Sequence, residues 1–158
     1  MNNFFTNCTR CCLIIMMAAC RKEAPVIANT TPGLLIAVNT LRSIGCVCGD
    51  TWMPPVKALE WNDTLAAAAL LHARDMEANS YFSHISPGGS SPIQRAIITG
   101  YTGHFVTENI AKGFTSPEMV MEAWQQSESH CKAMMDGSHT DMGAARANSH
   151  WVQEFGSH

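Results

Sequence analysis

Three polar residues that lie far apart in the chain have side chains able to bind metal ions or transfer protons: His84 in "YFSHISPGG", Glu108 in "TENIAKG" and His130 in "SESHC". Two imidazoles and one carboxylate can hold a divalent transition metal such as zinc and leave a coordination position open for water. Glu108 is then the candidate general base that activates this water in a hydrolase. Residue type and spacing alone do not establish that the three side chains meet.

The same residues have two further interpretations. They can line a cleft that binds a ligand without any reaction, or Glu108 can accept hydrogen bonds from both imidazoles and fix the surrounding loops. Cys131 directly follows His130, but neighbours in sequence do not face each other on a helix, so a cysteine protease is not expected. His72 shares a helical stripe with apolar residues and is expected to be buried and hydrogen-bonded rather than a ligand.

Four helices are expected to position these residues. A serine cap followed by proline at the first helical position predicts the start of two of them, and an asparagine or aspartate cap before a run of strong helix formers predicts another. The expected helices run from Pro32 to Gly45, from Asn62 or Asp63 towards an end at His84, from Ser91-Pro92 to Gly100, and from Ser116-Pro117 through "MVMEAWQQSESHCKAMMD".

The remaining segments predict a loop and a small sheet. Pro54 and Pro55 exclude a helix from residues 46–61, which we expect to be a long loop. The late segment "TDMGAARANSHWVQEFG" predicts two short strands joined by a turn at Asn148-Ser149. The chain is therefore expected to have an α+β fold, mostly helical, such as a helix–sheet–helix sandwich.

Length and charge narrow the classes of protein. A chain of 158 residues is enough for one domain and short for two. The net charge is −3 and the ten Lys and Arg residues are scattered, so no basic stripe is available for phosphates. Nucleic acid is therefore not an expected partner.

The N-terminus has the features of an export signal. One arginine, Arg10, precedes the apolar residues 13–19, a stretch of seven that is too short to span a bilayer. The sequence "MAAC" at 17–20 resembles a bacterial lipobox, in which the cysteine becomes the lipidated first residue of the mature chain. We therefore predict a lipoprotein signal peptide over residues 1–19 and a lipidated Cys20 followed by a tether to residue 32; an ordinary secretory signal and an uncleaved anchor are the alternatives.

Cleavage before Cys20 leaves three cysteines in the folded part. In an oxidising compartment the simplest arrangement is one disulfide from Cys131 to either Cys46 or Cys48, with one free thiol. Such a bridge closes a long loop and contributes about 4 kcal/mol in the chain-entropy model. A zinc site formed by the three cysteines is the alternative.

Several short motifs occur in an order that resembles bacterial proteins of the CAP superfamily, relatives of cysteine-rich secretory proteins, antigen 5 and plant pathogenesis-related proteins. They are "FSH", "ENIA", a W…S…H pattern, "MGAA" and "SHWVQEFG", supported by "PPVKALEWNDTLAAAALLHARDM". The resemblance implies a CAP/SCP domain over residues 33–157. It also implies an α-β-α sandwich with about four helices and a small antiparallel sheet.

Members of this family carry a surface cavity lined by two histidines and two acidic residues. The resemblance places His84, Glu108 and His130 at three of these positions. The second acid falls at Ser127, so it is missing; Glu128 is adjacent, and Ser127 and Glu128 are secondary candidates for the cleft.

The resemblance and the N-terminus together predict a membrane-anchored lipoprotein of the bacterial cell envelope, outside the cytoplasm. Its expected role is a binding or interaction module for a lipid, a peptide or an envelope protein, with a His/Glu cleft that is a candidate site for a divalent metal such as zinc. A metal-dependent, peptidase-like hydrolase that uses the same cleft is the alternative. Because fold alone does not determine function, the choice depends on the geometry of the cleft.

Overall fold

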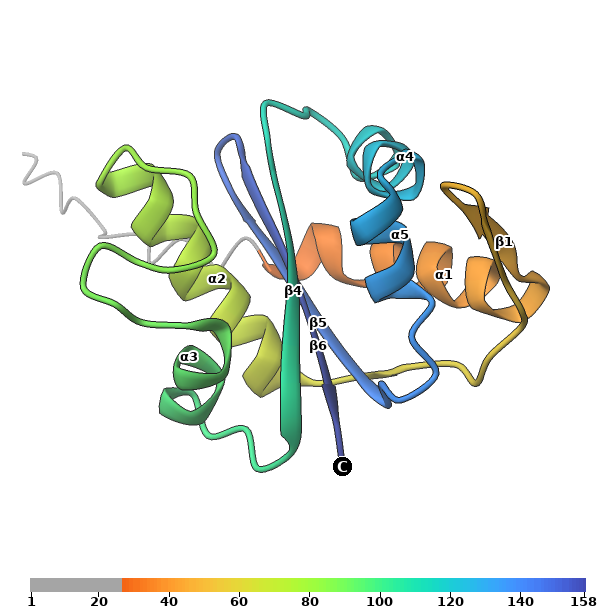
Figure 1. Cartoon of the computed structure of the whole chain (residues 1–158). Helices are drawn as coiled ribbons and strands as arrows, with labels where there is room; N and C mark the ends of the chain where they lie inside the picture. The colour runs from red at the N-terminus through yellow and green to blue at the C-terminus, as the bar shows by residue number, and fades with distance from the viewer. Residues whose placement is uncertain (1–26) are drawn as a thin grey trace, which may run out of the picture.

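The computed structural model describes residues 27–158, and the predicted signal peptide, Cys20 and most of the predicted tether lie outside this range. The described chain has three layers, with one sheet between two groups of helices (Figure 1). Helices α1 (Ile27–Ile44), α4 (Pro117–Gln126) and α5 (Glu128–Met134) cover one face, and α2 (Asp63–Ala78) and α3 (Pro92–Ile98) cover the other. The predicted α+β class and α-β-α sandwich are confirmed. Within residues 27–158, no helix has the length and apolar character needed to cross a membrane.

The central sheet has four strands in the order β3-β5-β6-β4. Strand β6 (His150–Ser157) lies between β5 (Asp141–Ala147) and β4 (His104–Lys112) and is antiparallel to both. The short β3 (Glu60–Trp61) adds a parallel edge next to β5. The predicted hairpin of the last two strands is confirmed, and its turn contains Asn148 at φ 46°. The sheet is therefore mixed rather than wholly antiparallel.

Apolar side chains fill both spaces between the sheet and the helices. Trp124, Trp151 and Phe155 belong to the core under α1, α4 and α5, whereas Met76 and Val152 belong to the core under α2. The sheet and α2 are in very close contact, because the alanine-rich helix lies on a glycine of β5. A Cβ atom added at Gly143 would come within 2.1 Å of the Ala66 backbone nitrogen.

Two boundaries in the N-terminal half differ from the predictions. Helix α1 starts at Ile27, inside the segment expected to be a tether, and ends as predicted before Gly45, whose φ of 75° suits glycine. The expected loop over residues 46–61 contains the two-stranded hairpin of β1 (Cys46–Cys48) and β2 (Thr51–Met53). The proline pair follows β2, so it excludes helix without preventing the hairpin.

The helix expected from Ser116-Pro117 is in fact two helices. Ser127 has extended backbone angles (φ −91°, ψ 120°) and ends α4 while it also caps α5. The described chain therefore has five helices rather than about four. The predicted cap of α2 is confirmed, because the Asn62 side chain accepts hydrogen bonds from the backbone N–H groups of Thr64 and Leu65.

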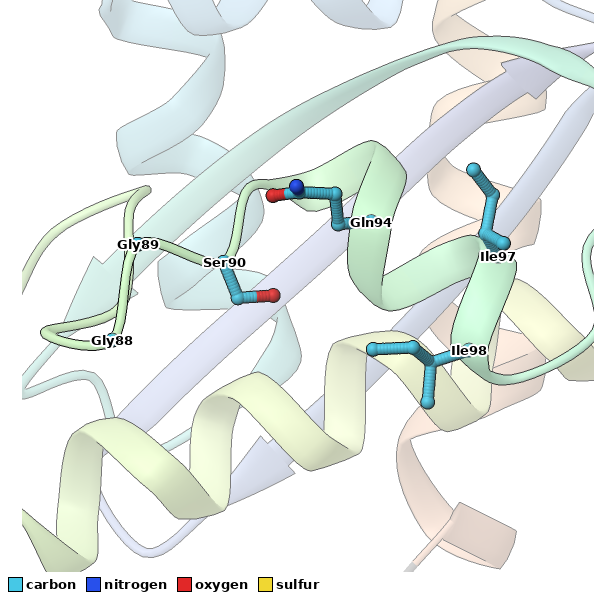
Figure 2. A pocket seen from close by; sticks show the side chains of 6 residues that line it. All are labelled: Gly88, Gly89, Ser90, Gln94, Ile97 and Ile98. Atoms are coloured by element: carbon cyan, nitrogen blue, oxygen red, sulfur yellow. The ribbon is translucent and has the colours of Figure 1, made fainter.

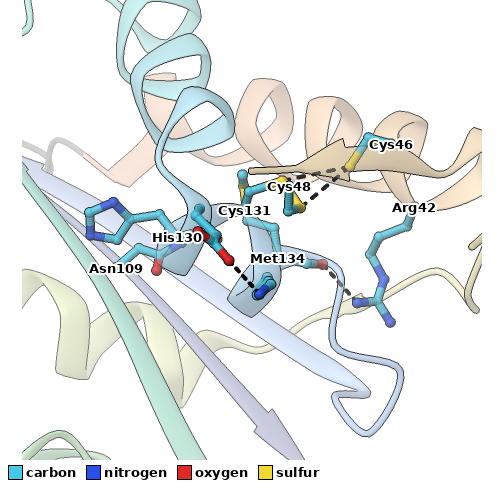
Figure 3. Close-up of a disulfide and its surroundings, with 9 residues drawn as sticks. Arg42, Cys46, Cys48, Asn109, His130, Cys131 and Met134 are labelled. Atoms are coloured by element: carbon cyan, nitrogen blue, oxygen red, sulfur yellow. Dashed lines mark hydrogen bonds and ion pairs between the residues drawn. A yellow bond between two sulfur atoms is a disulfide. The ribbon is translucent and has the colours of Figure 1, made fainter. Parts of the chain in front are cut away.

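A disulfide ties the β1–β2 hairpin to α5 (Figure 3). It joins Cys48 to Cys131, whose Cα atoms are 5.5 Å apart, and leaves Cys46 as a free thiol. Of the two pairings open from the sequence, the structure has the one with Cys48.

Candidate functional site

Glu108 is the centre of a buried polar cluster, which we define as His72, His84, Arg95, Glu108 and Glu154. It lies on β4, and its side chain is 1% exposed. One carboxylate oxygen, Oε1, is 2.7 Å from His84 Nδ1, and the other, Oε2, accepts a 2.7 Å hydrogen bond from Arg95 Nη2. Both oxygens of Glu108 therefore have charge-assisted or polar partners from outside the sheet.

His84 does not end a helix, contrary to the prediction. Helix α2 stops at Ala78, and Asn79 closes its last turn through a backbone hydrogen bond to Asp75. His84 lies in the following segment, the 79–91 loop, which connects α2 to α3. Its side chain is 49% exposed, while its Nδ1 faces inward to Glu108. One edge of the ring therefore contacts the buried cluster, and the rest of the ring is partly exposed to solvent.

The polar cluster also holds the 79–91 loop through its backbone. Arg95 Nη1 donates to the Ser90 carbonyl at 2.8 Å, and Nη2 donates to the His84 carbonyl at 3.1 Å. His72 Nε2 is 2.9 Å from the Ser83 carbonyl oxygen. His72 is buried and hydrogen-bonded as predicted, and burial lowers the pKa of its ring even though the nearby Glu108 carboxylate favours its protonation. The neutral ring therefore supports the loop near pH 7.

Glu154 is a second carboxyl group beside Glu108. The two residues are cross-strand partners on β6 and β4, and the Glu154 side chain is fully buried. Neither of its carboxyl oxygens has a hydrogen-bond partner among the described residues. Burial, and then the neighbouring Glu108 carboxylate, raises the pKa of Glu154 well above its ordinary value, which favours its protonated form.

His130 lies on α5, where its ring points away from the disulfide formed by Cys131 (Figure 3). Its backbone carbonyl accepts a 3.2 Å hydrogen bond from Asn109 Nδ2. Burial lowers the pKa of the His130 ring, and the nearby His84 ring lowers it further. The charges of His84 and His130 therefore lie close enough to interact.

The geometry does not assemble the predicted metal site from His84, Glu108 and His130. Over residues 27–158, Cys46, Cys48 and Cys131 make up the one set of three or more His, Cys, Asp or Glu residues whose ligand atoms all lie within 4.8 Å of one another. Glu108 is also paired with the Arg95 cation, which opposes the binding of another cation. His84, Glu108 and His130 therefore do not form such a set in this structure, and we derive no reaction through a metal ion there.

The secondary candidates do not replace the missing acid. Ser127 forms the junction of α4 and α5. Glu128 accepts a 2.6 Å hydrogen bond from Lys132 on the same helix, and its carboxyl group packs against Gly49 in the β1–β2 turn. Its carboxylate therefore belongs to the hairpin side of the molecule rather than to the Glu108 cluster.

Two adjoining cavities flank the 79–91 loop on its outer side. The larger, about 800 Å³, extends from α2 to Arg95, and the smaller, about 380 Å³, lies between the loop and α3 (Figure 2). Both cavities are lined by Gly88 and Ser90, so they meet at the loop. Ile97 and Ile98 line the smaller cavity and are 61% and 72% exposed. This apolar surface was not predicted from the sequence, because exposed isoleucines in a short helix cannot be distinguished there from core residues.

The comparison with known proteins agrees with this fold. The chain is 35% identical over 102 residues to the uncharacterized protein YkwD of Bacillus subtilis, which covers 63% of this chain and 40% of YkwD. An extracellular protein containing an SCP domain from Bacillus anthracis superposes with a TM-score of 0.72 at 24% identity, over 82% of this chain and 40% of that protein. An outer surface protein of Borrelia burgdorferi superposes with a TM-score of 0.60 at 26% identity, over 65% of this chain and 79% of that protein.

The chain thus matches less than half the length of YkwD, and a shared domain does not transfer the activity of a longer protein. The model of the CAP family, described as the cysteine-rich secretory protein family, matches residues 35–155. This match covers nearly all of the described fold, including the polar cluster and both cysteines of the disulfide. The chain therefore belongs to the cysteine-rich secretory protein (CAP) family.

Proposed function

We propose that this CAP domain is a binding module outside the cytoplasm, and that it holds an elongated apolar ligand, a fatty acyl chain, on the surface formed by the 79–91 loop and α3. The observation that carries the proposal is that the hydrogen bonds of the polar cluster go to the 79–91 loop. Arg95, His72 and Glu108 each bind the backbone or a side chain of the 79–91 loop. A cluster that fixes one loop in one conformation lowers the entropy lost when a ligand binds to that loop.

The state of Glu108 favours binding over catalysis. A general base needs a free oxygen within reach of a substrate proton. In Glu108 both oxygens are already bonded, to His84 and Arg95, and the carboxylate is buried. Glu154, the other carboxyl group of the cluster, is fully enclosed, and its raised pKa favours the protonated form. The cluster therefore supports a structural role beneath the binding surface.

The chemistry of the outer surface favours an apolar chain. Ile97 and Ile98 are exposed beside a cavity, and Leu71 is exposed beside the adjoining one. Exposed apolar groups around connected cavities are typical of ligand or interaction sites. The two cavities meet at Gly88 and Ser90, which suits a long, narrow molecule rather than a compact one.

The test is a titration of the full-length chain with a fluorescent long-chain fatty acid, with unlabelled palmitate as competitor. The variant Ile97→Ser/Ile98→Ser should weaken binding at least about tenfold, a loss of roughly 1.4 kcal/mol, since each isoleucine contributes burial energy of that order. Ile36→Ser/Ile44→Ser is the matched control, because these two α1 isoleucines are 64% and 65% exposed on another surface. Equal affinities for the two variants, or no saturable binding by the unmodified chain, would refute the acyl-chain site.

The anchoring of the domain is the second part of the proposal. We propose that Cys20 carries the lipid and holds the domain at the bacterial cell envelope; the extracellular and outer-surface locations stated for the two solved relatives support a site outside the cytoplasm. In cell fractionation the unmodified chain should be found with membranes, whereas Cys20→Ser should move to the soluble fraction. An unchanged membrane fraction for the variant would contradict lipidation at Cys20.

The alternative function, a metal-dependent hydrolase, requires Glu108 to leave Arg95 and His130 to approach His84. A calorimetric zinc titration of the full-length chain with Cys8, Cys11, Cys12, Cys20 and Cys46 changed to serine tests this site separately from the cysteines. Micromolar binding that is lost in the additional variant His84→Ala/His130→Ala would revive the hydrolase. No heat in either protein would reject it.

A further inference from the structure

Three sulfur atoms form a compact triangle between the β1–β2 hairpin and α5 (Figure 3). The hairpin and α5 lie on the other side of the sheet from the proposed ligand surface (Figure 1). The free thiol of Cys46 has its Sγ 3.6 Å from Cys131 Sγ and 3.7 Å from Cys48 Sγ. Cys48 and Cys131 are joined as the disulfide. Cys46 and Cys48 are two residues apart on one strand, so their side chains leave the same face of β1 and meet Cys131 from α5.

The nearly equal distances from Cys46 Sγ to the two disulfide sulfurs distinguish between disulfide exchange and metal binding. In disulfide exchange, an attacking thiolate approaches one sulfur along the extension of the S–S bond. Cys46 instead lies beside the bond, at almost the same distance from both of its ends. That position does not suit direct attack, but it suits three ligands arranged around one ion.

The size of the triangle also matches a metal site. Zinc binds thiolate at about 2.3 Å, and tetrahedral angles then place neighbouring sulfurs about 3.8 Å apart. The two distances from Cys46, 3.6 Å and 3.7 Å, are already close to this value. Only the third pair of sulfurs, now covalently bonded, has to separate.

We propose that reduction of the Cys48–Cys131 disulfide creates a three-thiolate site for one thiophilic metal ion, of the Zn²⁺ and Cd²⁺ class, formed by Cys46, Cys48 and Cys131. A dithiol or phosphine reductant supplies two electrons and breaks the S–S bond, and two protons complete the two new thiols. Binding of the ion displaces one proton from each of the three thiols, so three protons are released. A water molecule is the fourth ligand, and reoxidation of Cys48 and Cys131 removes two ligands and expels the ion.

The surrounding structure keeps the ligands together when the covalent bond opens. Cys48 and Cys131 are fully buried, and the hairpin that carries Cys46 and Cys48 is closed by pairing of β1 with β2. Arg42 donates 2.8 Å and 2.9 Å hydrogen bonds to the carbonyls of Met134 and Asp136, which fixes the end of α5 against α1. The three sulfurs are thus held by contacts that do not depend on the disulfide.

The test uses the full-length chain with Cys8, Cys11, Cys12 and Cys20 changed to serine, so that only the three described cysteines remain. The protein is reduced with a phosphine without oxygen and titrated with Cd²⁺, whose thiolate complexes absorb in the ultraviolet. We expect one Cd²⁺ per chain, three protons released, and displacement by Zn²⁺. The oxidised protein should bind at least 100-fold more weakly.

Cys46→Ser is the matched variant, because it keeps both disulfide cysteines. After reduction it should give about two thirds of the charge-transfer absorbance and bind Cd²⁺ at least tenfold more weakly. Equal absorbance and affinity in the reduced parent and in Cys46→Ser would overturn the proposal, as would equal binding by the oxidised parent.

Loss of the fold on reduction is controlled separately. Near-ultraviolet circular dichroism of reduced protein, with and without Cd²⁺, is compared with that of Cys48→Ala/Cys131→Ala, which has neither bridge nor site. We expect the reduced parent with Cd²⁺ to give the native spectrum. A reduced chain that stays unfolded with one equivalent of Cd²⁺ also overturns the proposal.

Discussion

Replacement of Arg95 by methionine should strongly destabilise the domain, because it removes the cation that faces the buried Glu108 carboxylate. Arg95 is 1% exposed, as is Glu108, and the two side chains share a 2.7 Å hydrogen bond. Arg95 also donates to the carbonyls of Ser90 and His84. Removal of one partner from such a buried pair costs about 3–5 kcal/mol, so we expect the free energy of unfolding to fall by about 4 kcal/mol.

A double-mutant cycle separates the pair from its surroundings. Glu108→Gln removes the carboxylate and leaves the Arg95 cation buried, whereas Arg95→Met/Glu108→Gln removes both charges. Because the double variant leaves no unpaired charge, its loss of stability should be at least about 1–2 kcal/mol smaller than the sum of the two single losses. Urea unfolding followed by tryptophan fluorescence gives each value.

Two further measurements make the result specific. Arg74→Met removes an exposed arginine of α2 and should change stability by less than about 0.5 kcal/mol. Limited proteolysis should cut Arg95→Met within the 79–91 loop faster than it cuts Arg74→Met, because two of the hydrogen bonds that hold the loop are lost. An Arg95→Met loss below about 1 kcal/mol, or strictly additive losses in the cycle, would refute the reasoning.

Three other predictions concern the core, the cluster and the disulfide. Gly143→Ala should lower the free energy of unfolding by about 3 kcal/mol in urea titrations, because the added Cβ would meet the backbone of α2 at Ala66. Gly88→Ala is the control, because a Cβ added there would have no atom within 4 Å. The effect of Glu154→Gln on stability should depend on pH. Because the pKa of Glu154 is raised in the folded state, its contribution to the parent's stability is complete below the unfolded-state pKa, near 4.5, and is lost as pH rises. The melting temperature of the variant relative to the parent should therefore increase between about pH 4.5 and pH 8. A relative melting temperature that is flat or falls over this interval would show that Glu154 does not resist ionisation. Cys48→Ser/Cys131→Ser removes the disulfide between residues separated by 83 positions and should lower the free energy of unfolding by about 4 kcal/mol, measured by thermal unfolding without reductant. A loss below about 1 kcal/mol would show that the disulfide does not stabilise the domain by closing a long loop.

The sequence was sufficient for the elements with strong local signals. The Asn62 cap, the alanine-rich interior of α2 and the serine–proline starts of α3 and α4 depend on interactions within one turn of helix, so each could be predicted without the rest of the fold. The break at Ser127 could not, because serine is also tolerated inside helices, and only the structure shows its extended backbone.

The polar cluster was only partly predictable. His84 and Glu108 could be paired because the family resemblance brings their motifs together, and not because of any signal in their spacing. Arg95 and Glu154 gave no signal, since charged residues in a helix or strand are normally exposed. Strand β6 is buried on both faces, so it lacks the alternation that would have marked Glu154 as an inward residue.

The central position of β6 also determines when this domain can fold. Strands β4 and β5 do not pair with each other; each pairs with β6, the last strand in the described chain. The chain must therefore be synthesised to the end of β6 before the sheet can close. Until then the central position between β5 and β4 is empty. The order of strands thus makes any chain that stops before residue 150 unable to form the four-stranded sheet.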